Sequence, residues 1–276
     1  MGVFGKRDAH VRALQQVIEA TNAFLVFGGL FSPWSGPSMK ADSTQPNAGP
    51  TCTVRLLGRM DYDTAWEFQK SLAERRACLQ VPDTLLFVEH PPTYTLGLGG
   101  REDNFRTPPS ELARLGAVVR RVDRGGDVTF HGPGQLVGYP VISLEGRRGG
   151  VLRYLRELEE VLIVALKHWG VQAQTIRRHT GVWVGNEKIA AIGVKVTTRH
   201  ITQHGFALNL STDLRFFDHI VPCGIPEKGV TSIGRLTGYA PSLQQAAKTV
   251  AQAFGEVFHR CMAWEDASAG TDGNPS

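Results

Sequence analysis

Residues 124–140, RGGDVTFHGPGQLVGYP, combine five glycines and two prolines with one histidine and one glutamine. Gly125 and Gly126 lack a Cβ, so their backbone amides can approach a bound group closely and can adopt a positive φ. The segment Gly132-Pro133-Gly134 predicts a tight turn directly after His131. Phosphate-binding loops place their glycines differently, ahead of Lys-Ser/Thr or at the opening of a helix. This stretch therefore predicts a site-building bend between two strands of one sheet, in which His131 is either structural or part of a site.

Cys223 lies in IVPCGIPEKGVTS, between Pro222 and Gly224, outside any helical or strand periodicity. An accessible thiol in a loop can act as a nucleophile when a nearby cation or base favours its thiolate form. The alternative is a loop cysteine without a role. The residues that could assist Cys223 are His90, His131, His204, Lys188 and Lys195.

Lys188 opens the apolar strand KIAAIGVKV, directly after a Gly-Asn-Glu turn. Its neighbours Ile189 to Ile192 are all apolar, which predicts an ammonium group at the mouth of a low-dielectric pocket. A lysine in such a place can exchange protons near neutrality. The alternative is an exposed lysine at the end of a hairpin, and Lys195 on the same strand is expected to be solvated.

The other three cysteines, Cys52, Cys78 and Cys261, form no C-x-x-C pair and no Cys/His cluster at zinc spacing. This argues against a structural metal and against a disulfide scaffold, and it favours a reducing, cytoplasmic setting. All three fall in apolar strand or helix patterns, so they are predicted to be buried, inert thiols.

The chain has 276 residues, of which 42% are hydrophobic and 20% charged, and a formal net charge of +4. These values are typical of a water-soluble protein with one large domain. Basic residues alternate with acidic ones, which favours an acidic protein partner over nucleic acid. No apolar stretch reaches the roughly 18–20 residues of a membrane span, so no membrane association is expected.

Hydrophobic periodicity predicts the elements that must position these residues. Strands are expected at residues 51–57, 84–89, 94–97, 118–122, 127–130, 136–143, 172–176, 181–184, 188–196 and 205–210. Helices are expected at residues 63–79, 110–115, 151–169 and 243–262, and Gly185-Asn186 is expected to be a hairpin turn.

Mixed strands and helices with late hairpins predict an α+β (mixed α/β) domain instead of a doubly wound parallel sheet. Residues 1–50 are interpreted as an N-terminal extension that is partly disordered, or of which residues 1–38 precede the true start at Met39. Residues 266–276 lack apolar anchors and are predicted to be a disordered tail.

Four blocks occur in order, RGGDVTFHGPGQLVGYP, GNEKIAAIGVKV, HGFALNLSTDL and IVPCGIPEKGVTS. Together they resemble the lipoyl(octanoyl) transferase family, the octanoyl-[acyl carrier protein]:protein N-octanoyltransferases. The resemblance covers residues 51–265, which it identifies as one catalytic domain. It implies a mixed sheet flanked by helices, like the catalytic domain of biotin protein ligases and lipoate ligases.

The resemblance also implies a Cys/Lys dyad, in which Cys223 carries the acyl group as a thioester and Lys188 exchanges its proton. It implies a supporting role for His90, in EHPPTYTLG, and the need for neither a cofactor nor a metal. The implied acyl-binding residues are Arg124, Gly125, Gly126, Asp127, Val128, Thr129, Phe130, His131, Ala191, Ile192, Gly193, Gly205, Phe206 and Ala207.

By this resemblance the enzyme takes an octanoyl or lipoyl group from acyl carrier protein and transfers it to a lysine of a lipoyl domain. This is the first step of endogenous protein lipoylation, and the implied acceptors are the lipoyl domains of 2-oxoacid dehydrogenases and the glycine cleavage H protein. Three alternatives stay open: an ATP-using lipoate or biotin ligase, an inert binding protein for acylated partners, and a cysteine hydrolase.

Overall fold

A mixed sheet forms the centre of the computed structural model, which describes residues 49–221 and 228–265. Along the sheet the strands lie in the order β12-β1-β2-β6-β10-β9-β8-β7, and β11 pairs with β9. The parallel pairs are β12–β1, β1–β2 and β11–β9, and the other neighbours are antiparallel. The strands are β1 (Thr51–Arg59), β2 (Asp83–Glu89), β6 (Gln135–Val141), β7 (Gln174–Ile176), β8 (His179–Val184), β9 (Glu187–Val196), β10 (Thr202–Asn209), β11 (Gly229–Val230) and β12 (Cys261–Trp264).

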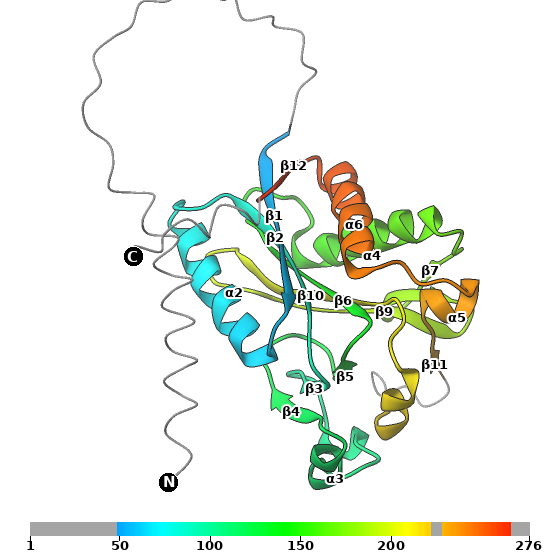
Figure 1. Cartoon of the computed structure of the whole chain (residues 1–276). Coiled ribbons are helices and arrows are strands. Elements are labelled where there is room, and N and C mark those ends of the chain that lie inside the picture. The colour runs from blue at the N-terminus through cyan, green and yellow to red at the C-terminus, as the bar shows by residue number, and fades with distance from the viewer. Residues whose placement is uncertain (1–48, 222–227, 266–276) are drawn as a thin grey trace, which may run out of the picture. The chain divides into compact units, whose positions relative to one another are not determined.

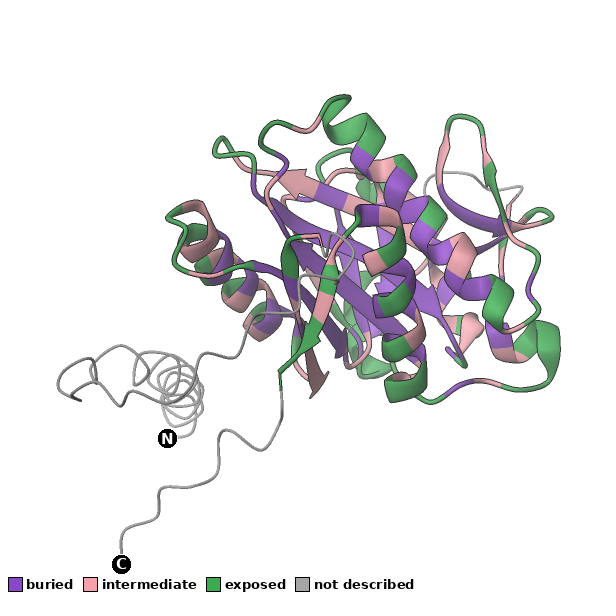
Figure 2. Ribbon diagram, turned by 90° about the horizontal axis from the view of Figure 1, so that it is seen from above, coloured by how far each residue is buried: buried purple, intermediate pink, exposed green. Residues whose placement is uncertain are grey.

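Helices cover both faces of this sheet (Figure 1). On one face lies α2 (Tyr62–Ala77), which contacts β6 and β10, and on the other lie α4 (Gly150–His168) and α6 (Leu243–Phe258), which contact each other. The apolar stripe of α4, including Leu158 and Leu162, points into the larger core cluster, as its periodicity predicts. Each helix is buried toward the sheet and exposed on its outer side (Figure 2). The prediction of a mixed sheet flanked by helices is confirmed.

A second, three-stranded sheet lies at one end of the domain (Figure 1). It has the order β4-β3-β5 and a core cluster of its own. Its strands are β3 (Thr93–Leu96), β4 (Val118–Arg121) and β5 (Val128–His131). The domain also contains the short helices η2 (Glu102–Asn104), α3 (Pro109–Arg114), η3 (Leu214–His219) and α5 (Ile233–Thr237).

The turn at Gly132–Gly134 corrects one sequence prediction, because it joins two strands of different sheets. β5 pairs with β3, whereas β6 pairs with β2 and β10. The turn itself is present, since the Gln135 amide donates to the Gly132 carbonyl over 3.2 Å. Apolar alternation detects two successive strands, but it does not reveal which partners each strand finds.

The last predicted helix is also too long. It ends at Phe258, His259 adopts a left-handed φ of 54° as its cap, and the chain continues as β12 beside β1. Cys261 is therefore exposed on a strand, and Cys78 is exposed at the end of α2, so the prediction of buried thiols is correct for Cys52 only. Edge strands and helix ends can continue an apolar sequence pattern although their residues stay exposed.

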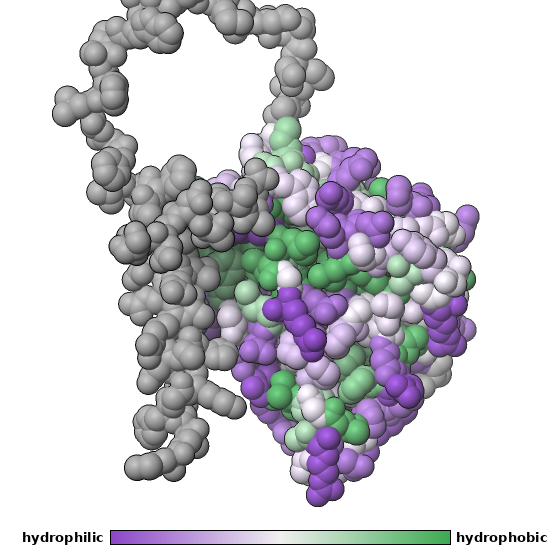
Figure 3. Space-filling model, viewed as in Figure 1, coloured by the Kyte–Doolittle hydropathy of each residue, from purple (hydrophilic) through white to green (hydrophobic). Residues whose placement is uncertain are grey.

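Polar side chains cover most of the face shown in Figure 3, with an apolar band across the middle at the height of β1. Among the described helices none is long and apolar enough to cross a membrane. The described residues also hold no group of three or more metal-ligating side chains. The sequence predictions for residues 1–48, for 266–276 and for Cys223 lie outside the described residues.

Candidate functional site

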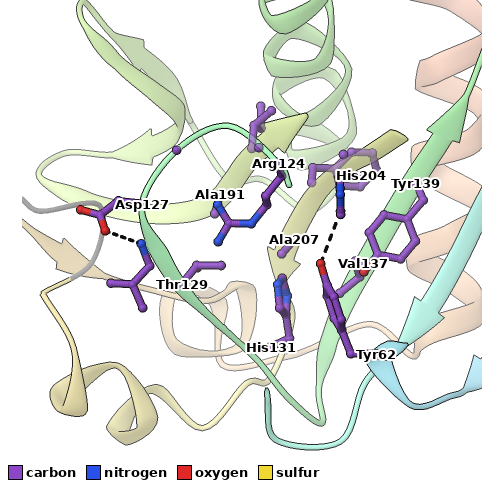
Figure 4. A pocket seen from close by; sticks show the side chains of 16 residues that line it. Tyr62, Arg124, Asp127, Thr129, His131, Val137, Tyr139, Ala191, His204 and Ala207 are labelled. Carbon is purple, nitrogen blue, oxygen red and sulfur yellow. Dashed lines mark hydrogen bonds between the residues drawn. The ribbon is translucent and has the colours of Figure 1, made fainter. Parts of the chain in front are cut away.

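A pocket lies on the α2-facing side of the large sheet, between β6, β10 and β9 on one side and β5 with the preceding glycine loop on the other (Figure 4). The space free of protein atoms in and in front of it is about 470 Å³, open solvent at the mouth included. The lining residues are Tyr62, Arg124, Gly126, Asp127, Val128, Thr129, His131, Val137, Tyr139, Ala191, Ile192, Gly193, His204, Gly205, Phe206 and Ala207. Twelve of the predicted acyl-binding residues are therefore brought together.

The floor of the pocket consists of very small residues on two paired strands. Ala191 and Gly193 of β9 lie opposite Ala207 and Gly205 of β10. A Cβ on Gly193 would lie 2.9 Å from the carbonyl oxygen of Gly125, closer than side chains tolerate. The glycine loop rests directly on β9 for this reason, and the Gly125 amide donates to the Val194 carbonyl over 2.9 Å.

Arg124 fixes the same loop to the small sheet. Its Nη2 donates to the carbonyl oxygen of Thr95 on β3 and to the Thr95 hydroxyl, each over 2.8 Å, and its Nη1 donates to the Gly125 carbonyl. The guanidinium is buried, and such charge-assisted bonds are stronger than those between neutral groups. Arg124 thus serves to hold the loop in place.

Aromatic side chains gather at one end of the pocket. Tyr62, Tyr139, His131 and His204 lie together on one side in Figure 4, opposite Asp127 and Thr129. Burial lowers the pKa of His204 to about 4, lowers the pKa of His131 well below its usual value, and raises the pKa of Tyr62 and Tyr139. Near neutral pH this end of the pocket therefore carries uncharged rings.

Sequence reasoning did not predict four of the residues that line the pocket, although it named one of them, His204, as a possible partner of Cys223. Val137 and Tyr139 lie at alternate positions of β6, so their shared face was predictable once that strand was assigned to the pocket wall. His204 follows the same logic from β10, although its φ of 57° interrupts the alternation. Tyr62 carried no signal, because α2 reaches the pocket only through the tertiary fold.

At the opposite end of the pocket, hydrogen bonds and strand pairing link the site to the described segments before and after Cys223. Asp127 accepts a hydrogen bond from the Asn104 side chain, and the Asn104 carbonyl accepts one from the Val221 amide over 2.7 Å. After residue 227, Gly229 and Val230 pair with Glu187 and Lys188 at the start of β9. The described residues on both sides of 222–227 are thus tied to the Asp127 end of the pocket and to Lys188.

Lys188 lies at the start of β9, three positions before Ala191, and does not line the pocket. Its side chain is only 6% exposed, with Nζ donating to the Thr180 carbonyl over 3.1 Å. The ammonium also lies 4.6 Å from the ring centroid of Trp183, within the range of a cation–π contact. The burial expected for this lysine is confirmed and the alternative of an exposed hairpin lysine is excluded, whereas its expected position at the mouth of the pocket is not observed.

Three other predicted residues lie near the pocket without lining it. Gly125 belongs to the glycine loop and is bonded to β9 through its amide. Phe130 points into the core of the small sheet, where its ring stacks on that of Phe216 with 4.6 Å between the centroids. His90 is fully buried behind the aromatic end, with Nδ1 bonded to the Met60 carbonyl and Nε2 to the Tyr139 hydroxyl. Burial lowers the pKa of His90 to about 4.

Lys195 marks the far end of β9, and it is paired instead of freely solvated. Its Nζ lies 2.5 Å from Asp123, whose other carboxylate oxygen is bonded to His204.

Of the described cysteines, Cys52 is fully buried. Burial, and to a smaller extent the charge of Asp83, raises the pKa of its thiol to about 12. Cys52 is therefore no nucleophile.

The fold and the pocket agree with a known family. The model of the lipoyl protein ligase A/B catalytic domain matches residues 61–255, so the chain belongs to that family. This range contains all of the lining residues and both elements that flank Cys223.

Curated proteins whose sequences are similar to this chain are octanoyltransferases. The chain is 50% identical to the octanoyltransferase of Rubrobacter xylanophilus over 204 residues, which cover 74% of this chain and 91% of that protein. It is 46% identical to the mitochondrial octanoyltransferase LIP2 of Arabidopsis thaliana over 188 residues, 68% of this chain and 80% of that one. The chain is accordingly an octanoyltransferase, an acyltransferase of protein lipoylation.

Solved structures confirm the fold at low sequence identity. A putative lipoate protein ligase from T. acidophilum, solved with bound lipoic acid, has a TM-score of 0.60 and 16% identity, and it covers 80% of this chain and 91% of its own. LipL1 of P. falciparum, in complex with lipoate, has a TM-score of 0.61 and 11% identity, with 81% and 69% coverage.

Proposed function

We propose that this enzyme transfers an octanoyl group, or a lipoyl group, from acyl carrier protein to a lysine of a lipoyl domain through a thioester on Cys223. The observation that carries the proposal is the narrow pocket over Ala191, Gly193, Gly205 and Ala207, which begins three residues from the buried Lys188. An unbranched acyl chain fits a slot with such small floor residues. The octanoyltransferase relatives support the same acyl group.

In the first half-reaction the Cys223 sulfur attacks the thioester carbonyl of the donor. A new S–C bond forms, the bond to the carrier's thiol breaks, and the proton lost by Cys223 passes by way of Lys188 to the departing thiolate. One thioester replaces another of similar energy, so the activated acyl group is preserved and no ATP is consumed.

In the second half-reaction the lysine amine of a lipoyl domain attacks the Cys223 thioester. An amide bond forms, the S–C bond breaks, and a proton from the amine returns to the Cys223 sulfur with Lys188 as the relay. The amide is more stable than the thioester, which makes the transfer favourable. The lipoyl domains of 2-oxoacid dehydrogenases and of the glycine cleavage H protein are the proposed acceptors.

The other predicted residues receive supporting roles in this proposal. Arg124 and Gly125 hold the loop in place, Gly126 to Thr129 form its inner side, and His131 belongs to the aromatic end. His90 positions Tyr139 through the bond between Nε2 and the tyrosine hydroxyl. A proton-transfer role is assigned only to Lys188.

Intact-protein mass spectrometry after incubation with octanoyl-acyl carrier protein tests the mechanism. The wild-type protein should gain one octanoyl group, which hydroxylamine removes, and Cys223→Ser should not form this thioester. Cys78→Ser and Cys261→Ser are matched controls, because both thiols are exposed and remote from the lining residues. Octanoyl transfer that persists without Cys223 would contradict the dyad mechanism.

Lys188→Ala should slow acylation of Cys223 by about 10²–10⁴-fold, the usual contribution of general acid–base catalysis. Lys248→Ala is the control, because Lys248 lies on the exposed side of α6. Equal acylation rates in wild type and Lys188→Ala would remove the lysine from the mechanism. Transfer from free octanoate that depends on ATP would identify a ligase, and release of octanoate with an acceptor present would identify a hydrolase.

A further inference from the structure

The aromatic end of the pocket is a wall of buried rings whose polar atoms are hydrogen-bonded to one another or to neighbouring groups. Asp123 only accepts hydrogen bonds, so Nε2 of His204 donates to it over 2.8 Å, and Nδ1 of His204 accepts from the Tyr62 hydroxyl at 3.4 Å. The Tyr139 hydroxyl donates to Nε2 of His90, because Nδ1 of His90 donates to the Met60 carbonyl.

His131 completes this arrangement. The Gln135 amide nitrogen donates to the Phe130 carbonyl and to Asn209, so its oxygen is left to accept from Nδ1 of His131 at 3.0 Å. Nε2 of His131 then accepts from the Thr95 hydroxyl at 3.2 Å. With their polar atoms occupied in this way, the rings present carbon and hydrogen to the pocket, which suits the methyl end of an acyl chain.

Further rings support Tyr62 from behind and beside. Its ring stacks on His131 at 5.6 Å and contacts His90 at 5.2 Å and Trp66 at 6.4 Å, and Trp66 also contacts His204 at 5.9 Å. Side chains packed in this way do not swing aside without cost, because protein interiors are close-packed. The wall is therefore a firm stop.

Beyond the wall lies a separate surface groove. Lys195, which pairs with Asp123 behind His204, and Gln203, the neighbour of His204, both line this groove together with residues of α2 such as Lys70 and Ala77. Removing a ring from the wall would therefore lengthen the pocket toward open space.

The length of the floor matches the acyl group. The closed end is level with Val194, which pairs with His204, and the small floor residues begin at Ala191, which pairs with Ala207. Three strand residues span about 10 Å, which is the length scale of an extended octanoyl chain.

We propose that Tyr62 and His204 set the length of the acyl chain that the enzyme accepts, by closing the pocket about one octanoyl length from its open end. The proposal rests on the function proposed above. A longer chain would have to displace both rings and break the bonds of His204 to Tyr62 and Asp123. One additional methylene in a closed pocket is worth about 10–200-fold in specificity.

The test compares kcat/KM for acylation of Cys223 by octanoyl-, decanoyl- and dodecanoyl-acyl carrier protein. Wild type should prefer octanoyl, and Tyr62→Ala should raise the ratio of dodecanoyl to octanoyl by about tenfold or more. His204→Gly is the second opening variant, because glycine adopts the φ of 57° at this position without strain. Its ratio should rise in the same direction.

Two further variants separate the size of the ring from other effects. Tyr62→Phe keeps the ring and removes only the hydroxyl, so its ratio should stay near that of wild type. Tyr239→Ala removes an exposed tyrosine remote from the lining residues and should leave the whole profile unchanged. Urea unfolding of each variant shows that the measured protein is folded.

The outcomes distinguish the two proposals. A wild-type protein that is not acylated by any of the three donors contradicts the function proposed above. A wild-type protein that takes octanoyl, with unchanged ratios in both opening variants, overturns the role of Tyr62 and His204.

Discussion

Burial, more than residue type, determines the charge state of several side chains in this domain. His90 shows this most clearly: it is fully buried, bonded at both ring nitrogens, and surrounded by Tyr62, His131 and Tyr139. Desolvation lowers its pKa to about 4, against smaller opposing effects of the Met60 carbonyl and of Asp61. A histidine kept neutral in this way makes the fold sensitive to acid.

The expected consequence concerns the free energy of unfolding between pH 7 and pH 4. The folded pKa of His90 lies below the unfolded value, so the unfolded state binds the proton more readily and stability falls as the pH drops below about 6.5. Each such histidine contributes up to about 1.4 kcal/mol per pH unit in that window. Urea unfolding of wild type and His90→Gln at several pH values should show a shallower pH dependence in the variant.

His168→Gln provides the comparison, because His168 is exposed at the end of α4. Its unfolding free energy should follow the wild-type pH dependence. The same slope for His90→Gln and wild type would mean that His90 does not contribute to acid sensitivity.

At the scale of elements, the contact between β9 and the glycine loop determines the shape of the pocket. β9 and the loop approach so closely at Gly193 that their backbones are joined by the bond from the Gly125 amide to the Val194 carbonyl. This contact fixes the position of the glycine loop relative to β9.

Gly193→Ala should force the two elements apart. The new Cβ would lie 2.9 Å from the Gly125 carbonyl oxygen and 3.1 Å from Cδ of Arg124, and overpacking of this kind costs about 1–3 kcal/mol. Urea unfolding measures the loss of stability, and intact-mass kinetics should show slower acylation of Cys223. Gly99→Ala is the matched control, since its Cβ would make only ordinary contacts with the Gly126 carbonyl group, 3.4 Å from the oxygen and 3.8 Å from the carbon. Equal losses in the two variants would show that the contact at Gly193 is not special.

Most of these elements were predictable from periodicity. The apolar stripes of α4 and α6 and the runs at β2 and β9 reflect burial that a single sequence carries directly. Sheet membership was not predictable, because the partners of β5 and β6 are chosen by contacts far away in the chain. The loop, the floor and Lys188 were visible as local patterns, whereas Tyr62 reaches the pocket only through the placement of α2.

At the scale of the whole molecule, Asp83 joins the layers. Its carboxylate accepts from Arg76 near the end of α2 over 2.7 Å, from Arg260 between α6 and β12 over 3.1 Å, and from the Ser143 amide after β6 over 3.0 Å. Asp83 is 5% exposed, so one buried carboxylate connects the helices of both faces through the sheet.

Asp83→Ala should destabilise the domain by about 3–5 kcal/mol, because it leaves two largely buried arginines without this carboxylate. Asp103→Ala removes an exposed partner of Arg101 and should cost at most about 1 kcal/mol. Thermal and urea unfolding of the pair measure the difference. Similar small losses in both variants would contradict the role of Asp83 in joining the layers.

The pairing of β1 with β12 has a consequence for synthesis in the cell. Thr51 pairs with Cys261, some 210 residues later, so the outer edge of β1 acquires this partner only when almost the whole domain has left the ribosome. At about 5–20 residues per second, that wait lasts roughly 10–40 s. During this time an unpaired strand edge is exposed to neighbouring nascent chains, and such edges promote aggregation. The yield of native protein should therefore depend on how densely ribosomes load the message, even though the finished domain leaves Thr51–Val54 fully paired.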